Sequence, residues 1–162
     1  MLETLSDAGI NLALLVVVFV PLERAFPARA QRFFRTEFLT DLGFFLGSYL
    51  LFAAAVTLVL KQVSALSHAW LGHTAWRAEL RSLPIWVLLP LALLLGDLII
   101  YWFHRACHQY DFLWRFHRVH HTTREIDWLA AHREHPLDGL FTQLFLNLPG
   151  IVLGLPFQAI GG

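Results

Sequence analysis

Seven of the nine histidines lie between positions 104 and 135, in three groups with helical spacing. An HxxxH pair is followed by an HxxHH group and then by an HxxH pair. Residues three or four apart share one face of a helix, so each group can direct its rings to one side. Neutral imidazole binds zinc, copper, iron and nickel. We therefore predict a metal centre formed by His104, His108, His117, His120, His121, His132 and His135.

The number and type of these residues narrow the kind of centre. Seven imidazoles exceed the about four ligands of one tetrahedral zinc site and suit two metal ions better. The single cysteine, Cys107, can form neither an internal disulfide nor a cysteine ligand pair. Glu134 lies in His-Arg-Glu-His, which matches neither zinc-protease motif, HExxH or HxxEH. His68 and His73 are five residues apart, and we interpret them as surface residues.

Short helices can carry the second and third groups. Asp111 is a predicted N-cap for a helix that would place His117, His120 and His121 on one face. Thr122 and Glu125 have the spacing of a capping box for a further helix with His132. His135 precedes Pro136, which disfavours helical geometry there.

The elements that position the histidines are predicted to be membrane helices. The chain is 57% hydrophobic and 15% charged, whereas a soluble domain carries about 25% charged residues. Because a spanning helix needs about 20 apolar residues, we predict an all-α integral membrane fold with three to four spans in one domain, 1–162. Proline and glycine in the last stretch leave open a broken span or a re-entrant hairpin. The stretches are about 4–22, 38–60, 84–103 and 137–160.

Arginine placement predicts the orientation of the spans. Arginines follow the first and third apolar stretches, so the positive-inside rule puts 23–37 and 104–136 in the cytoplasm and 61–83 outside. We interpret these arginines mainly as anchors at the inner membrane surface. Arginine outnumbers lysine eleven to one, which favours a bacterial protein in the cell membrane. The formal net charge is zero, so no nucleic-acid partner is expected.

Four aspartates are candidates for supporting the histidines. Asp97 lies two helical turns before His104, inside the third stretch, where a carboxylate is a functional candidate by default. It could accept a hydrogen bond from a liganding histidine, bind metal, or make a helix-packing hydrogen bond. Asp41 has a similar, weaker interpretation. Asp127 and Asp138 could orient histidines or cap helices.

The chain resembles the fatty acid hydroxylase / sterol desaturase superfamily of integral-membrane di-iron enzymes. The resemblance rests on DLIIYWFHRACH at 97–108, LWRFHRVHH at 113–121 and DWLAAHREHPLD at 127–138. It implies two iron ions, for which zinc can substitute in a preparation, and O2-dependent hydroxylation or desaturation of a lipid such as a fatty acyl chain or sterol. It also implies an external electron donor of reductase, cytochrome or ferredoxin type.

One departure from the family pattern concerns the end of the chain. The family has a further HxxHH box downstream, whereas no histidine follows His135 here. We therefore expect the sequence to be the N-terminal part of a hydroxylase-like domain. The alternative is a non-catalytic membrane metal-binding or assembly protein, a truncated family member. A membrane cytochrome is a third possibility, but it would need histidines inside opposing spans.

Overall fold

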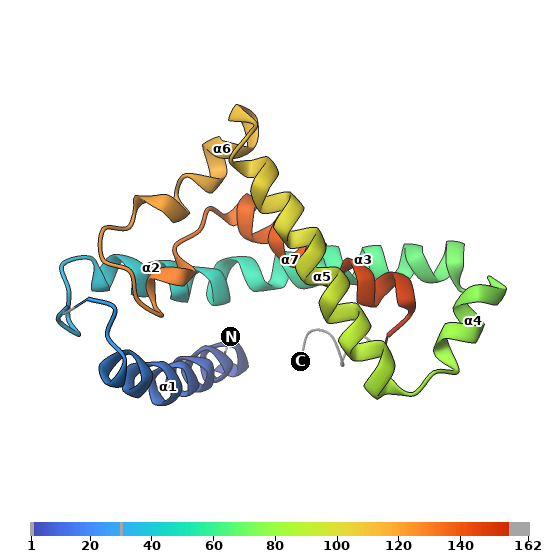
Figure 1. Ribbon diagram of the computed structural model, residues 1–162, viewed down its shortest axis with the longest axis horizontal. Helices are drawn as coiled ribbons and strands as arrows, with labels where there is room; N and C mark the ends of the chain where they lie inside the picture. The colour runs from blue at the N-terminus through green and yellow to red at the C-terminus, as the bar shows by residue number, and fades with distance from the viewer. Residues whose placement is uncertain (1, 30, 156–162) are drawn as a thin grey trace. The chain divides into compact units, whose positions relative to one another are not determined.

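The computed structural model describes residues 2–29 and 31–155, and these residues contain helices and turns but no β-strand. This confirms the all-α prediction. The helices are α1 (Leu2–Ala25), α2 (Phe38–Gly47), a π-helical turn (Ser48–Phe52), α3 (Ala53–Leu71), α4 (Ala75–Arg81), α5 (Ile85–Cys107), α6 (Asp111–His117) and α7 (Pro136–Leu153) (Figure 1). Two 3₁₀ turns, His120–Thr122 and Ala130–His132, lie between α6 and α7.

Four helices in the described part of the chain are long and apolar enough to cross a membrane: Ser6–Ala25, Phe38–Leu71, Ile85–Cys107 and Pro136–Leu153. The second is 34 residues long and passes the predicted end near residue 60, because α2, the π turn and α3 run on without a break. Pro149 lies within α7 and does not end it. The helix ends at Leu153, and Gly154 follows with a φ of 79°. The predicted continuation over 156–160 lies outside the described residues.

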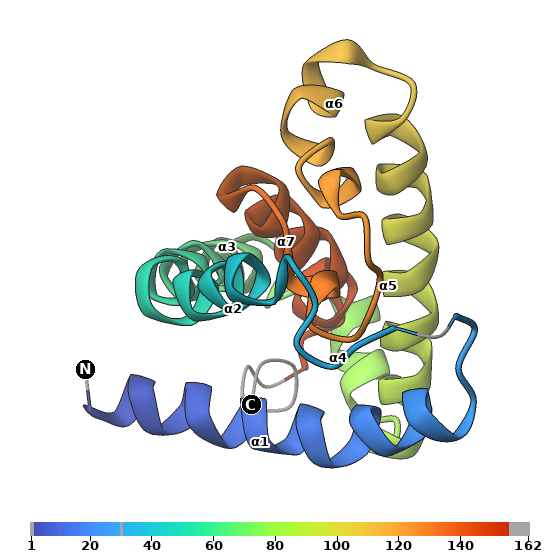
Figure 2. The ribbon, with the colours of Figure 1, turned by 90° about the vertical axis from the view of Figure 1, so that its left-hand side faces the viewer.

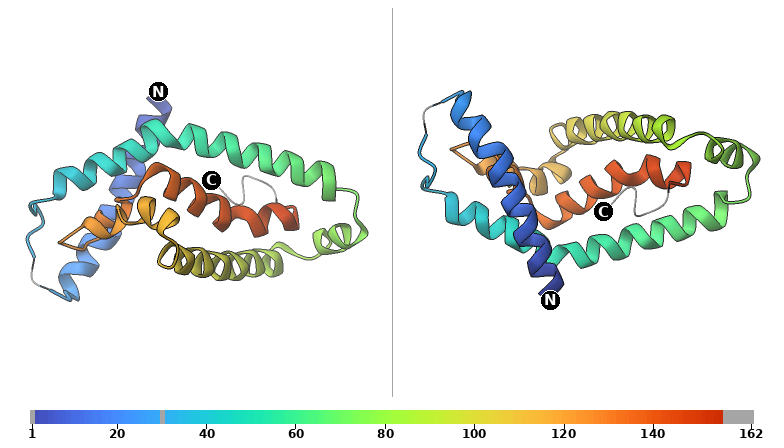
Figure 3. Two further views of the ribbon diagram at one scale, coloured as in Figure 1. Left: turned by 90° about the horizontal axis from the view of Figure 1, so that it is seen from above. Right: turned by 90° about the horizontal axis from the view of Figure 1, so that it is seen from below.

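The chain divides into two compact units, each built from two separate stretches. Unit 1 comprises the described residues of 2–54 and 115–136, and unit 2 comprises 55–114 and 137–155. In unit 1, Phe45, Trp128 and Leu129 are buried together, and apolar side chains of α1 pack on them. Figure 2 shows α1 as one continuous helix, and Figure 3 shows the segment before α7 passing beside α1 and α2. Unit 1 is therefore held by contacts between residues far apart in sequence.

Unit 2 is organised around α7, which lies between α3 and α5 (Figure 3). A Cβ added at Gly96 of α5 would lie 3.0 Å from the Leu146 carbonyl oxygen, so α5 and α7 approach closely at that glycine. Nearer the histidine end of α5, Phe103 packs on Phe145 with ring centroids 4.9 Å apart. At the other end, the buried guanidinium of Arg77 donates to the carbonyls of Ser67 (2.8 Å) and Ile151 (2.7 Å). The contacts at Gly96 and Phe103 hold α5, the helix that carries His104, and the Arg77 contacts hold α3, α4 and α7 together.

Candidate metal centre

The first histidine pair belongs to unit 2 and lies at the end of α5. His104 is in the last turn of the helix, and His108 is its C-cap, with its backbone N–H donating to the His104 carbonyl at 3.2 Å. The two Nε2 atoms are 3.2 Å apart. The ring of His108 also packs against Trp114, with centroids 5.3 Å apart. The pair is thus formed by helical spacing, as the sequence predicts.

The separation of these nitrogens fits a shared metal ion. A nitrogen ligand lies about 2.0–2.1 Å from its metal, so two ligands at 90–110° are about 2.8–3.4 Å apart. The observed 3.2 Å falls within this range. The exposed rings of both histidines leave space for further ligands. His104 and His108 therefore suit a metal-binding pair.

The second pair, His117 and His121, belongs to unit 1. Their Nε2 atoms are also 3.2 Å apart. The prediction that one helix carries His117, His120 and His121 is wrong, because α6 ends at His117 and His120–Thr122 is a 3₁₀ turn. The predicted N-cap, Asp111, is instead the first residue of α6. The pairing survives because the tighter turn still brings His121 back to His117.

His120 is oriented through its other ring nitrogen. Its Nδ1 lies 3.3 Å from the carbonyl oxygen of Arg133. A carbonyl can only accept a hydrogen bond, so this contact requires a proton on Nδ1 and leaves Nε2 with a free lone pair. This is the usual arrangement of a metal-binding histidine, in which one nitrogen donates to a carbonyl and the other binds the metal.

The third group does not form the predicted helix. Residues 123–129 are not helical, the Thr122 hydroxyl donates to the Val119 carbonyl at 2.7 Å, and Glu125 accepts from the Thr36 N–H at 3.1 Å. The capping box is therefore a wrong prediction. His132 ends a 3₁₀ turn and packs edge-on against Phe45, with centroids 4.9 Å apart, and burial lowers its pKa. His135 lies outside the helix, directly before α7, and packs on Phe116.

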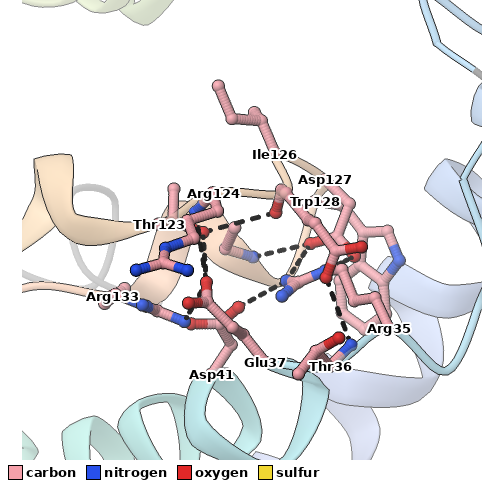
Figure 4. Close-up of polar contacts among 12 residues, drawn as sticks. Arg35, Thr36, Glu37, Asp41, Thr123, Arg124, Ile126, Asp127, Trp128 and Arg133 are labelled. Carbon is pink, nitrogen blue, oxygen red and sulfur yellow. Dashed lines mark hydrogen bonds and ion pairs between the residues drawn. The ribbon is translucent and has the colours of Figure 1, made fainter.

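A buried group of charged residues, which we call the ion network, connects the start of α2 to the 123–133 segment (Figure 4). Asp41 is 0% exposed and contacts the guanidiniums of both Arg35 and Arg133. Arg35 also donates to both oxygens of Asp127, at 2.7 and 2.6 Å. Arg133 is ion-paired to Glu37 at 3.1 Å. Asp41 and Asp127 thus have arginine partners, and Asp127 also caps a 3₁₀ turn by accepting from the Ala130 N–H at 2.8 Å.

The electrostatics of the network follow from these contacts. The hydrogen bonds that Arg35 donates to Asp127 raise the pKa of Arg35, and Asp41 adds to this effect. Burial raises the pKa of Asp127, but the hydrogen bonds from Arg35 and the Ala130 N–H outweigh it and hold the pKa below its ordinary value. The hydrogen bond from the Arg124 N–H and the nearby charge of Arg133 lower the pKa of Glu37. Each of these three shifts favours the ionised form of its group, the Arg35 guanidinium and the Asp127 and Glu37 carboxylates.

The other sequence candidates lie elsewhere. Asp97 is exposed on α5, and its role beside a liganding histidine stays a prediction. Asp138 is buried in the first turn of α7. His68 and His73 are exposed, as expected of surface residues.

The sequence interpretation missed the ion network. It treated the arginines of 23–37 and 104–136 mainly as surface anchors, which is wrong for Arg35 (5% exposed) and Arg133 (4%). It also gave no role to Glu23, whose carboxylate accepts from the Trp128 N–H at 2.7 Å. Part of the network could have been suspected from the sequence. Arg35 and Asp41 border an apolar stretch, and so do Asp127 and Arg133.

Comparison with known proteins agrees with this site. Residues 87–161 match the fatty acid hydroxylase family. A curated relative, ornithine lipid hydroxylase of Rhizobium tropici, is 29% identical over 103 residues, which cover 64% of this chain and 28% of that protein. The matched part of this chain thus covers little more than a quarter of that relative's length. No solved structure matches significantly. The family match covers somewhat less than half of the chain and includes all seven clustered histidines, so the histidine-rich part of this chain is similar to fatty acid hydroxylases.

Proposed function

We propose that this protein is an iron- and O2-dependent oxidoreductase that hydroxylates a C–H bond of a lipid, with desaturation as the related outcome. One observation carries the proposal. His104 and His108 have Nε2 atoms 3.2 Å apart, and His117 and His121 show the same separation. The apolar helices and the match to the fatty acid hydroxylase family support a membrane location. Such a location would give the site access to lipid. The name of the relative favours hydroxylation of a polar membrane lipid.

Both histidine pairs would contribute to one centre for two iron ions. His104, His108, His117 and His121 are candidate ligands, and His120, His132 and His135 would complete or support the set. Only eight residues separate His108 from His117, so the chain keeps the pairs within about 30 Å even when fully extended. Imidazole suits iron as a ligand. Iron held there would supply the activation of dioxygen for oxidising a C–H bond.

Residues of this chain would keep the histidines in a state that can bind the metal. The Arg133 carbonyl keeps the proton of His120 on Nδ1, so that Nε2 stays available. Burial lowers the pKa of His132, which keeps its ring neutral at physiological pH. The exposed arginines would place the histidines at the cytoplasmic face, where an external electron donor can reach them.

The direct test combines metal analysis with lipid analysis. The wild-type, His104→Ala and His120→Ala proteins are each expressed in a bacterial host, and the iron content of each purified protein is measured. The membrane lipids of each culture are analysed by mass spectrometry for an added oxygen or a loss of two hydrogens. We expect bound iron and one new lipid product with the wild type, and no product with either variant. Bound iron without any product would favour the non-catalytic metal-binding alternative. Absence of iron would refute the proposed function.

A further inference from the structure

We propose that Asp41 is a positioning residue for the metal centre, and that it acts on His120 and His132 through Arg133. This inference rests on the proposed function, because it assigns Asp41 a role toward the metal ligands. The Asp41 carboxylate contacts the guanidiniums of Arg35 and Arg133. The link to the histidines runs through the main chain of Arg133.

The first step is that Asp41 fixes the Arg133 side chain. Asp41 is wholly buried, and the Arg133 side chain is only 5% exposed. The guanidinium lies between two carboxylates, since its Nε donates to Asp41 and its terminal nitrogen is ion-paired to Glu37 at 3.1 Å (Figure 4). A guanidinium held by two carboxylates has little freedom to rotate, because each carboxylate fixes a different edge of the planar group.

The second step is that the Arg133 backbone orients two histidines. Its N–H donates to the Ala130 carbonyl at 3.1 Å and closes the 3₁₀ turn that ends in His132. Its carbonyl accepts from His120 Nδ1 at 3.3 Å. One residue therefore sets the backbone at His132 and the proton position of His120, and its side chain is held by Asp41.

The third step concerns why so many charges are buried. A buried ion pair is often no more stabilising than well-packed apolar residues, because removing charges from water is costly. In some proteins such groups are retained because they specify one defined geometry. Around the network, the segment 123–129 has no helix to define its backbone. The ion network fixes the backbone of this segment, which lies beside the predicted ligands His121 and His132.

The test uses the full chain in detergent or nanodiscs and two measurements that do not depend on activity. Co²⁺ is titrated as a spectroscopic metal probe, and ¹⁵N NMR of labelled histidine, assigned with His120→Ala, reports which ring nitrogen of His120 is protonated. Asp41→Asn is expected to weaken Co²⁺ binding about 10–100-fold, as loss of a ligand's supporting partner does, and to mix the two tautomers. Asp41→Glu, which keeps the charge, should restore part of the affinity.

Two further variants complete the design. Glu37→Gln weakens the hold on the same arginine at a partly exposed position, so it should produce a smaller change in the same direction even if Asp41→Asn does not fold. Asp7→Asn is the matched control, because it makes the same substitution at an exposed residue of α1, and it should change neither readout. The double variant Asp41→Asn/His120→Ala should lose less Co²⁺ affinity than the two single losses combined, because part of the Asp41 effect acts through His120.

The outcomes separate this inference from the proposed function. A folded Asp41→Asn protein with unchanged Co²⁺ affinity and an unchanged His120 tautomer overturns the positioning role, as does an unaffected Glu37→Gln protein where Asp41→Asn fails to fold. A wild-type protein that binds metal but makes no lipid product overturns the proposed function and leaves the positioning role intact. The tautomer measurement needs no bound metal, so it decides the matter even for a chain that takes up no Co²⁺.

Discussion

The two histidine pairs have the same Nε2 separation, 3.2 Å, but different structural origins. His104 and His108 lie one turn apart at the end of the 23-residue helix α5. His117 and His121 lie on either side of the point where α6 ends and a 3₁₀ turn begins. The first geometry follows from regular helical spacing, whereas the second depends on tertiary contacts. The two pairs therefore have the same Nε2 separation, but we expect them to respond differently to substitutions elsewhere in the chain.

The surroundings of the pairs differ in the same way. Unit 2 holds its pair by helix packing, through the close approach at Gly96 and the packed rings of Phe103 and Phe145. Unit 1 holds its pair directly before the 123–133 segment, which the ion network ties to the start of α2. We expect substitutions of charged residues to disturb unit 1 and substitutions that affect helix packing to disturb unit 2.

The largest expected effect is that of Arg35→Ala. It leaves Asp41 and Asp127 without their shared arginine, and breaking a buried pair costs about 3–5 kcal/mol. Hydrogen exchange of backbone amides should speed up over 123–133 and stay unchanged over 85–107. Arg29→Ala, at an exposed position, is the control and should change neither segment. Equal acceleration in α5 would contradict the separation of the two regions.

Next in size is the loss of a ligand from either pair. His108→Ala and His121→Ala should each weaken Co²⁺ binding by about 100-fold or more, which is about 2.7 kcal/mol, because the remaining histidine lacks its partner at 3.2 Å. Titration followed by visible absorption measures the affinity. His73→Ala, an exposed histidine outside the cluster, should leave it unchanged. If only one of the two variants lost affinity, the pairs would not share the metal-binding role.

A smaller effect is expected from Gly154→Ala in unit 2. Gly154 has a φ of 79°, and an added Cβ would lie 2.7 Å from Nε of Arg77, whose guanidinium is fixed by two hydrogen bonds. The left-handed backbone alone costs a non-glycine residue about 1–2 kcal/mol. Thermal unfolding in detergent should show a lower midpoint. Gly9→Ala, where nothing lies within 4 Å of the added Cβ, should be neutral or slightly stabilising.

The smallest expected effect is a pH dependence confined to unit 1. The pKa of Asp127 is lower in the folded protein than its ordinary value of 3.8. Its contribution to stability is therefore complete above that ordinary value and is lost as the pH falls through the lowered pKa. Amide exchange, corrected for its intrinsic pH dependence, should show 123–133 losing protection below about pH 4 before 85–107 does. Asp127→Asn should remove that part of the pH dependence.

The contrast between the pairs also explains what could be predicted from the sequence. The apolar helices and the His104/His108 pair depend on spacing within one helix, and the sequence predicts both. The ion network could not be predicted, because Arg35 and Asp127, like Asp41 and Arg133, are 92 residues apart. The helical capping box at Thr122 failed because Glu125 is engaged by the Thr36 N–H, 89 residues away. The π turn at Ser48–Phe52 likewise has no simple sequence pattern.

The separation of Asp41 from Arg133 has a consequence for biosynthesis. At about 5–20 residues per second, the ribosome needs roughly 5–20 s to make the 92 residues between them. During that interval the nearby Arg35 is the arginine partner that Asp41 can reach, six positions away along the chain. Asp41 can therefore form an ion pair with Arg35 before the segment that contains Arg133 has been translated.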